Sequence, residues 1–280
     1  CNIIFATSFG FEDYVKEVAS EYPDIQFCHA TGYQAADSGL DNFHNYFASI
    51  YEGRYLAGIA AGMKTETNKL GYVAAFPFAE VISGYTAFYL GAKSVNPDVT
   101  MDIMYTNSWN DPTVESQVAK ALIDRGCDVI SQHSDSTAPA TTAEENGVWQ
   151  VGYNNDMIEA APDASLISPR IDWGIYVTEA VQAVINGDEI PVDWCKGLED
   201  GAVYLSPLNT DIAAEGTQEA IDAAEEKLIS GEIHVFDGPL KGVSPEGEEY
   251  EVPEGEYYHE QEEASAPSWL YIIDGCNVVE

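Results

Sequence analysis

The stretch LGYVAAFPFAEVISGYTAFYL, residues 70–90, contains an apolar strand that leads almost at once into an amphipathic helix. Its first six residues form a short apolar run that stops before Pro77, which is typical of a buried strand. From residue 79 onward apolar side chains recur at the spacing of one helix face. The residues of this face are Val81, Tyr85, Phe88 and Ala92. A strand followed directly by a helix is the repeating unit of a parallel α/β sheet.

The same alternation continues along the chain. We predict strands at residues 2–7, 25–29, 70–75, 100–106, 128–132, 149–153 and 166–168. We predict helices at residues 12–21, 51–63, 79–94, 113–125, 138–146, 173–186 and 215–230. This order favours parallel sheets with helices on both faces. Residues 232–280 are rich in Gly, Pro, Glu and Tyr, and they predict an irregular ribbon with a last strand near residues 269–273.

The charge of the chain is strongly negative, with 48 acidic and 11 basic residues and a formal net charge of −37. Such a surface repels phosphate backbones, which argues against nucleic acid as a partner. The excess is steepest in residues 232–280, where 13 acidic side chains accompany a single Lys. We interpret it as a means of solubility in a salty or extracellular medium. The alternative is a cation-binding tail, although these acids lack the spacing of a calcium loop.

Catalytic and metal-binding motifs are absent from the sequence. No G-x-S-x-G, G-x-G-x-x-G, G-x-x-x-x-G-K-[ST] or H-E-x-x-H motif occurs, and the five cysteines contain no C-x-x-C pair. We therefore predict no catalytic residue, no metal site and no cofactor. Cys1 leads directly into an apolar run without a polar tether, so we interpret it as a structural residue. No apolar run approaches 18 residues, the length that would predict a membrane span.

Polar and aromatic side chains follow five of the predicted strands. In an open parallel sheet, ligands bind at the carboxyl ends of the strands. Aromatic rings beside amide and carboxylate groups suit a flat heterocycle with polar edges. His133 also ends a strand, and we interpret it as a hydrogen-bonding wall residue. The predicted ligand-binding residues are Phe9, Phe11, Glu80, Asn107, Trp109, Gln132, Ser134, Asp135, Tyr153, Asp156 and Trp173.

Nine phrases between residue 3 and about residue 240 make the sequence similar to the basic membrane protein family. They include YEGRYLAGIAAG at residues 51–62, YTNSWNDP at residues 105–112, ALIDRGCDVISQHSDSTA at residues 121–138 and GYNNDM at residues 152–157. Members of this family are lipoprotein components of ABC importers, similar to the PnrA purine-nucleoside receptors. The resemblance implies a type I periplasmic-binding fold, with two Rossmann-like α/β lobes joined by a hinge. It also implies a cleft that closes on a purine nucleoside or purine base, and an ABC permease as partner.

The resemblance also sets the expected organisation of the chain. We expect lobe one at residues 1–68 and 188–240, lobe two at residues 69–187, and an acidic ribbon at residues 241–280 near the hinge. Asp156 and Trp173 would face the cleft from lobe two. The family pattern has a βαβ unit before the strand at residues 2–7. We expect the lipid anchor that attaches the protein to the membrane, and one wall of the pocket, to belong to that preceding part.

Two other classes of function remain open on the same fold. The chain would be an enzyme if the pure protein turned over a nucleoside, although no nucleophile–base motif supports this. It would be a ligand sensor if it passed information to a partner protein rather than to a permease. Importer genes beside its own gene would favour transport, and a kinase gene would favour sensing.

Overall fold

The structure is a computed structural model that describes residues 1–261 and 264–280. The chain forms two compact units. Unit 1 comprises residues 1–49, 171–203 and 260–267, and unit 2 comprises residues 50–170, 204–259 and 268–280. The chain thus passes between the units at residues 49–50, 170–171 and 203–204, and it returns to unit 1 once more near its end.

These limits differ from the lobe limits expected from the sequence, which lay at residues 68–69 and 187–188. Two helices account for the difference. Helix α3 (Ile50–Lys64) belongs to unit 2, where it packs along α4 (Ala79–Val95). Helix α7 (Trp173–Asn186) belongs to unit 1, where the ring of Tyr176 stacks on Tyr46 with 4.0 Å between the centroids.

Unit 1 is built on a four-stranded parallel sheet with the order β1-β2-β3-β9. Its strands are β1 (Ile3–Ala6), β2 (Gln26–Ala30), β3 (Phe43–Ala48) and β9 (Asp193–Lys196). The chain after β1 forms the short helix η1 (Phe9–Phe11) and then α1 (Glu12–Glu21), and α2 (Ala35–Ser38) follows β2. Apolar side chains of α1, α2 and the sheet bury one another in a small core.

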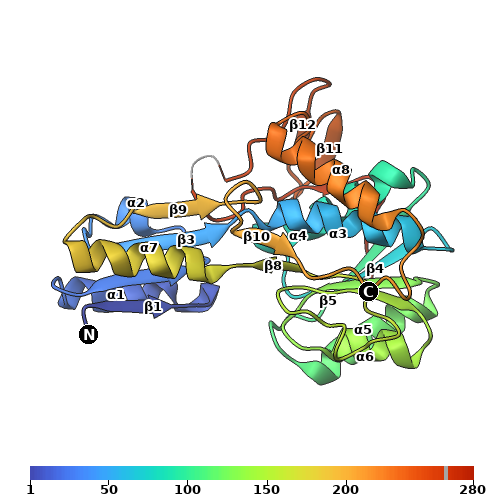
Figure 1. The fold of residues 1–280 in the computed structure, drawn as a ribbon, viewed down its shortest axis with the longest axis horizontal. Helices are drawn as coiled ribbons and strands as arrows, with labels where there is room; N and C mark the ends of the chain where they lie inside the picture. Colours follow the sequence, from blue (N-terminus) through green and yellow to red (C-terminus); the bar gives the residue numbers. More distant parts are fainter. Residues whose placement is uncertain (262–263) are drawn as a thin grey trace. The chain divides into compact units, whose positions relative to one another are not determined.

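Unit 2 is built on a five-stranded parallel sheet with the order β14-β5-β4-β6-β7, of which β4 and β5 are labelled in Figure 1. Its strands are β4 (Lys69–Ala74), β5 (Thr100–Tyr105), β6 (Val129–His133), β7 (Trp149–Val151) and β14 (Cys276–Val278). The helices around it are α3, α4, α5 (Pro112–Asp124), α6 (Ala138–Glu145) and α8 (Thr217–Ser230). Two short strands, β8 (Pro169–Ile171) and β10 (Val203–Leu205), pair separately where the chain changes unit.

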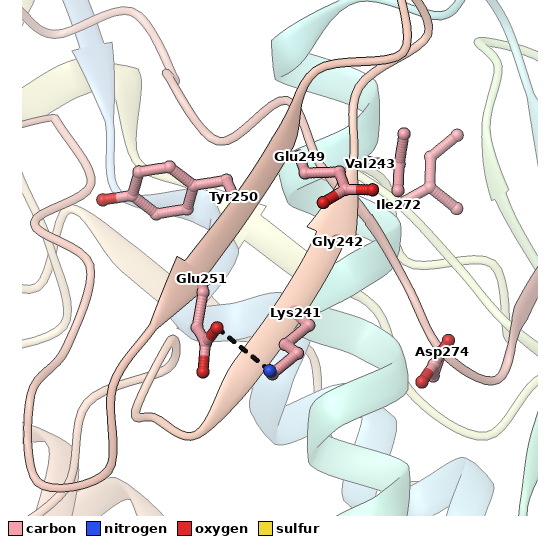
Figure 2. A pocket seen from close by; sticks show the side chains of 8 residues that line it. All are labelled: Lys241, Gly242, Val243, Glu249, Tyr250, Glu251, Ile272 and Asp274. Carbon is pink, nitrogen blue, oxygen red and sulfur yellow. Dashed lines mark ion pairs between the residues drawn. The ribbon is translucent and has the colours of Figure 1, made fainter.

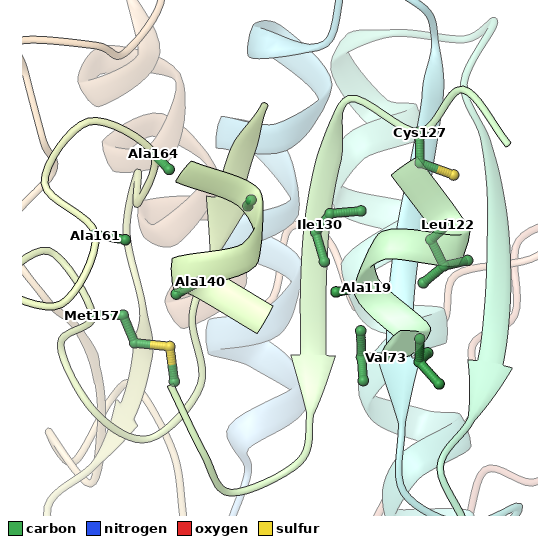
Figure 3. Packing of buried hydrophobic residues seen from close by; sticks show 11 residues of the cluster. Val73, Ala119, Leu122, Cys127, Ile130, Ala140, Met157, Ala161 and Ala164 are labelled. Carbon is green, nitrogen blue, oxygen red and sulfur yellow. The ribbon is translucent and has the colours of Figure 1, made fainter. Parts of the chain in front are cut away.

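The sheet of unit 2 is covered on both faces, as the apolar character of β4 predicts. Successive side chains of a strand point to opposite faces. Val73 joins the buried cluster that α5 and α6 complete, with Leu122 and Ala140 among its members (Figure 3). The neighbouring Tyr72 instead packs on the ring of Phe88 in α4, with centroids 5.9 Å apart.

Helices α3 and α4 approach each other closely because glycines lie at their contact. A Cβ atom on Gly58 would overlap the carbonyl oxygen of Phe88, and one on Gly91 would overlap that of Tyr55. Any side chain at these two positions would push the helices apart. The close contact lies in the second half of α4, and it fixes this helix, which bears Glu80 in its first turn, relative to α3.

The C-terminal part is more regular than the ribbon predicted from its composition. Strands β11 (Leu240–Val243), β12 (Glu249–Val252) and β13 (Ile272–Ile273) form an antiparallel sheet, and β14 joins the large parallel sheet. The predicted strand near residues 269–273 corresponds to β13. Aromatic side chains pack together in this segment: the fully buried Trp269 stacks on Phe236, with ring centroids 4.9 Å apart.

The predicted fold class is confirmed, because both units are α/β with parallel sheets. Every predicted helix is present with ends within two residues of those expected. Strands β3 and β9 of unit 1 were not predicted from the sequence, and the strand expected at residues 166–168 lies instead at β8. Among the described residues, no helix combines the length and apolar character needed to cross a membrane.

Candidate ligand-binding site

The carboxyl ends of four neighbouring strands bring the predicted loops of unit 2 together. Strands β5, β4, β6 and β7 are adjacent and parallel, so the loops that follow them share one edge of the sheet. Ligand sites of open parallel sheets lie at this edge.

Five rings form a continuous row across these loops, which we call the aromatic row: Phe76, Phe78, Trp109, His133 and Tyr153. The rings of Phe76 and Phe78 are stacked, with centroids 5.2 Å apart and planes 15° apart. Trp109 lies 5.3 Å from Phe76 and 6.2 Å from His133, and His133 lies 4.5 Å from Tyr153. Phe78 remains 38% exposed, whereas His133 and Tyr153 are buried. One end of the row is therefore accessible and the other is embedded in unit 2.

A buried carboxylate that the sequence analysis did not single out fixes the loops after β5 and β6. Glu115, on α5, is fully buried. Its Oε1 accepts a hydrogen bond from the Asp111 amide at 2.9 Å, and its Oε2 accepts hydrogen bonds from the amide and hydroxyl of Ser136. The Asp135 amide also donates to the Trp109 carbonyl at 2.8 Å. These bonds hold Trp109 in its place in the row.

Gln132 and Ser134, both predicted to bind ligand, are buried at the end of β6. The side-chain amide of Gln132 donates to the carbonyls of Ser134 at 2.8 Å and Ser136 at 2.7 Å. Gln132 thereby positions the loop. The hydroxyl of Ser134 has no hydrogen-bond partner within the described part of the chain.

Arg54 is a fully buried cation next to the aromatic row, and the sequence analysis did not include it in the site. Its guanidinium lies over the Tyr153 ring, 3.6 Å from the centroid, and Nη1 donates to the Gln132 carbonyl at 2.7 Å. Nε and Nη2 have no hydrogen-bond partner among residues 1–261 and 264–280. The sequence did contain a signal for this residue, because Arg54 is the only basic residue in the apolar, glycine-rich segment 51–62. Burying a charge costs free energy, so a basic residue in such a segment indicates a function.

Glu80 and His133 face each other beside this cation. Glu80 Oε1 lies 3.5 Å from His133 Nε2, and the Glu80 side chain is 15% exposed. Burial, reinforced by the nearby Asp135 carboxylate, raises the pKa of Glu80 to about 7. Burial, reinforced by the charge of Arg54, holds the pKa of His133 well below its ordinary value. The carboxyl group therefore holds a proton more readily than the imidazole does.

The other predicted residues of unit 2 lie on the exposed side of the loops. Asn107 has a φ of 54°, a left-handed conformation that Asn tolerates, and its side chain is exposed. Asp135 is exposed at the turn after β6. Asp156 is exposed in the loop after β7, where its Oδ1 accepts from the Ile158 amide at 3.0 Å. Their part in ligand binding stays a prediction.

Unit 1 holds the remaining three predicted residues. Phe9 and Phe11 follow β1 and are 36% and 57% exposed, and Phe9 stacks with Tyr33 at 6.1 Å. Trp173 begins α7, half-buried, with its ring 5.6 Å from Tyr46. It therefore belongs to unit 1 and not to the unit that holds Asp156, because α7 packs on the sheet of unit 1.

A second buried carboxylate shapes the loop after β2. Glu12 is 2% exposed, and its Oε1 accepts from the amides of Tyr33 and Gln34 at 2.8 Å each and from the side chain of Asn45 at 3.0 Å. Gly32 passes so close to Glu12 that a Cβ would overlap the carboxylate. Glu12 thus presents the exposed ring of Tyr33 beside Phe9.

The C-terminal sheet carries a separate shallow pocket of about 460 Å³ (Figure 2). Lys241 pairs there with Glu251 at 3.0 Å, and Tyr250 points away from the other lining side chains. No cluster of three or more His, Cys, Asp or Glu side chains suited to a metal ion exists within the described residues. The pocket lacks the convergent rings of the aromatic row, and we therefore place the candidate ligand site at the row.

A family model described as "ABC transporter substrate-binding protein PnrA-like" matches residues 1–237. The chain belongs to this family. A purine-binding protein of Brucella abortus is 39% identical over 239 residues, covering 85% of this chain and 67% of the relative. A Haloferax volcanii protein, whose name proposes a role as an ABC transporter glucose-binding protein, is 39% identical over 268 residues, covering 95% of this chain and 66% of the relative. The chain thus spans about two thirds of the length of these curated relatives.

Solved structures support the same fold. An ABC transporter solute-binding protein from Aeropyrum pernix superimposes with a TM-score of 0.70 at 18% identity, covering 87% of this chain and 77% of that one. The expected periplasmic-binding fold is therefore confirmed, as is the resemblance on which it was based.

Proposed function

We propose that this chain is the ligand-binding part of an extracytoplasmic solute-binding protein that captures a purine base or nucleoside for an ABC importer. The family supports the coarse role of substrate binding for a transporter. The ligand class, the permease partner and attachment to the membrane through a lipid anchor are parts of the proposal.

The aromatic row is the observation that carries the purine assignment. A purine has two flat faces, and rings that meet at offset or tilted angles 5–6 Å apart offer it matching surfaces. Polar groups next to the row can read the edge of the heterocycle: the Glu80 carboxyl, the His133 imidazole and the Ser134 hydroxyl. The purine-binding name of the Brucella abortus relative supports the same assignment.

Glucose is the second candidate, because the relative named for glucose binding matches 95% of this chain. A hexose would need many hydrogen bonds from polar side chains and only one ring platform. Two of the polar side chains near the row, Gln132 and Glu115, already bond to loop backbone and are not available to a hexose. The row therefore favours the flat heterocycle over the sugar.

Capture would use the aromatic row of unit 2 as the platform for the ligand. Phe9, Phe11 and Trp173, which belong to unit 1, stay predicted ligand-binding residues. No bond is made or broken in this scheme.

A thermal-shift panel tests the proposal. The protein is heated with adenine, guanosine, glucose or leucine at matched concentrations. A bound ligand at 100 times its dissociation constant adds about 2.7 kcal/mol to the folded state, which raises the melting temperature by several degrees. We expect adenine or guanosine to produce this shift. A shift with glucose alone would select the second candidate, and a shift with leucine alone would overturn both.

A further inference from the structure

We infer that Glu80 and His133, buried beside Arg54, act as one proton-holding pair, and that ligand binding at the aromatic row is coupled to uptake of a proton by Glu80. This inference rests on the proposed function, because it concerns the regulation of the same site.

The geometry isolates this pair from other partners. Glu80 Oε1 approaches His133 Nε2 to 3.5 Å, and neither ring nitrogen of His133 has a hydrogen-bond partner in the described part of the chain. A neutral imidazole offers one donor and one acceptor, and a protonated carboxyl adds a donor that a carboxylate lacks. The protonation state of Glu80 therefore decides whether the pair presents an additional donor to a ligand.

Burial and the nearby Arg54 cation together keep the proton of the pair off His133. Burial is the larger cause of the lowered pKa of His133, and the buried Arg54 cation disfavours an imidazolium further. The same cation opposes, without cancelling, the effect of burial on Glu80, whose pKa is raised to about 7. Near neutral pH, the proton of the pair is thus held by Glu80 rather than by His133.

The other titratable groups around the pair do not compete for this role. On β4, burial raises the pKa of Tyr72 to about 12, and after β7 burial raises that of Tyr153 further still. Both phenols therefore stay neutral at physiological pH. Burial, reinforced by the Glu115 carboxylate, also raises the pKa of Asp135, but from a lower ordinary value than that of a Glu. Glu80 is the member of this group whose charge changes near neutral pH.

A ligand that covers the aromatic row removes water from Glu80 and raises its pKa further. Binding above pH 7 then requires a proton from solvent, and the affinity falls by up to about tenfold for each pH unit above the pKa of free Glu80. The protonated carboxyl can donate to a ring nitrogen or carbonyl acceptor of the heterocycle. This donor matches neutral bases that present an acceptor at their edge.

Isothermal titration calorimetry with adenine tests the inference. Titrations are made at about pH 6, 7 and 8, each in two buffers with different heats of ionisation, so that the protons taken up on binding can be counted. We expect the parent protein to bind with proton uptake at pH 7–8 and with affinity that declines above pH 7. We expect Glu80→Gln to bind with no pH dependence and no uptake. The control Glu145→Gln changes the same charge at an exposed site on α6 and should behave like the parent.

Two further variants assign the role of Arg54. Arg54→Met removes the cation that opposes protonation of Glu80, so the affinity should begin to decline at a higher pH. Arg54→Lys keeps the cation, so the affinity should decline over the same pH range as in the parent. If Arg54→Met fails to fold, the comparison of Glu80→Gln with Glu145→Gln decides alone. Adenine binding with the same affinity at all three pH values and no proton uptake would overturn this inference and leave the proposed function intact. Binding of no purine at any of these pH values would overturn both the inference and the proposed function.

Discussion

The burial of Glu80 predicts that this residue destabilises the folded protein at alkaline pH. A pKa raised from 4.5 to about 7 means that the folded state binds the proton more tightly than the unfolded state does. Stability is therefore lost as the pH rises from 4.5 through 7. Well above pH 7, the raised pKa lowers the free energy of unfolding by roughly 3 kcal/mol, because each pKa unit corresponds to about 1.4 kcal/mol.

The substitution Glu80→Gln removes this titration and tests the magnitude. The free energies of unfolding of the variant and the parent are measured with urea at about pH 4.5, 6, 7 and 8 at one fixed salt concentration. The free energy of unfolding of the variant, relative to that of the parent, should increase by about 3 kcal/mol between pH 4.5 and 8. Most of this increase should fall between about pH 5 and 7.5. The exposed Glu145→Gln should show no such trend. A difference between variant and parent that is constant over this range would refute the reasoning.

Three further predictions concern packing, the rings and the charge. In urea titrations, Gly58→Ala should lower the free energy of unfolding by about 1–3 kcal/mol or more, because its Cβ overlaps the Phe88 carbonyl. The control Gly10→Ala places its Cβ in open space and should change the free energy of unfolding by less than about 0.5 kcal/mol. Trp109→Ala and Trp173→Ala should each weaken purine binding in calorimetry by about 1–3 kcal/mol, by analogy with base–aromatic stacking elsewhere, and unchanged affinity would remove that ring from the site. The net charge of −37 predicts a melting temperature that rises between 0.1 and 1 M NaCl, since the Debye length falls from about 10 Å to about 3 Å, and a flat or falling curve would contradict it.

The sequence predicted most of the fold because the elements of unit 2 follow simple patterns. Strand β4 and helix α4 are continuous apolar or amphipathic segments, and they were located to within a residue. Strand β3 was missed because His44 and Asn45 interrupt its apolar run. Both are buried and satisfied by distant groups: His44 bonds to Gln26 and the Pro191 carbonyl, and Asn45 bonds to Glu12 and the Ala35 amide. Such partners lie too far along the chain for a local pattern to show.

The sequence located the loops of the candidate site, because loops at the ends of parallel strands can be located from the strands alone. The predicted set contained exposed polar groups such as Asp156 and buried ones such as Gln132, but it lacked two buried charges that organise the loops. Arg54 and Glu115 lie on helices rather than on loops, and only the tertiary structure brings them to the strand ends. The assignment of Trp173 to the second lobe differed from the structure for a similar reason, since helix periodicity does not show which sheet α7 packs against.

The central claim is that the aromatic row holds a purine, and a calorimetric titration tests it most directly. The purified protein is titrated with adenine, guanosine and glucose, with Trp109→Ala as the matched variant. The account predicts saturable binding of one purine per chain, weakened by about tenfold or more in the variant, and no heat from glucose. Binding of glucose with no response to either purine, or purine binding that Trp109→Ala leaves unchanged, would contradict it.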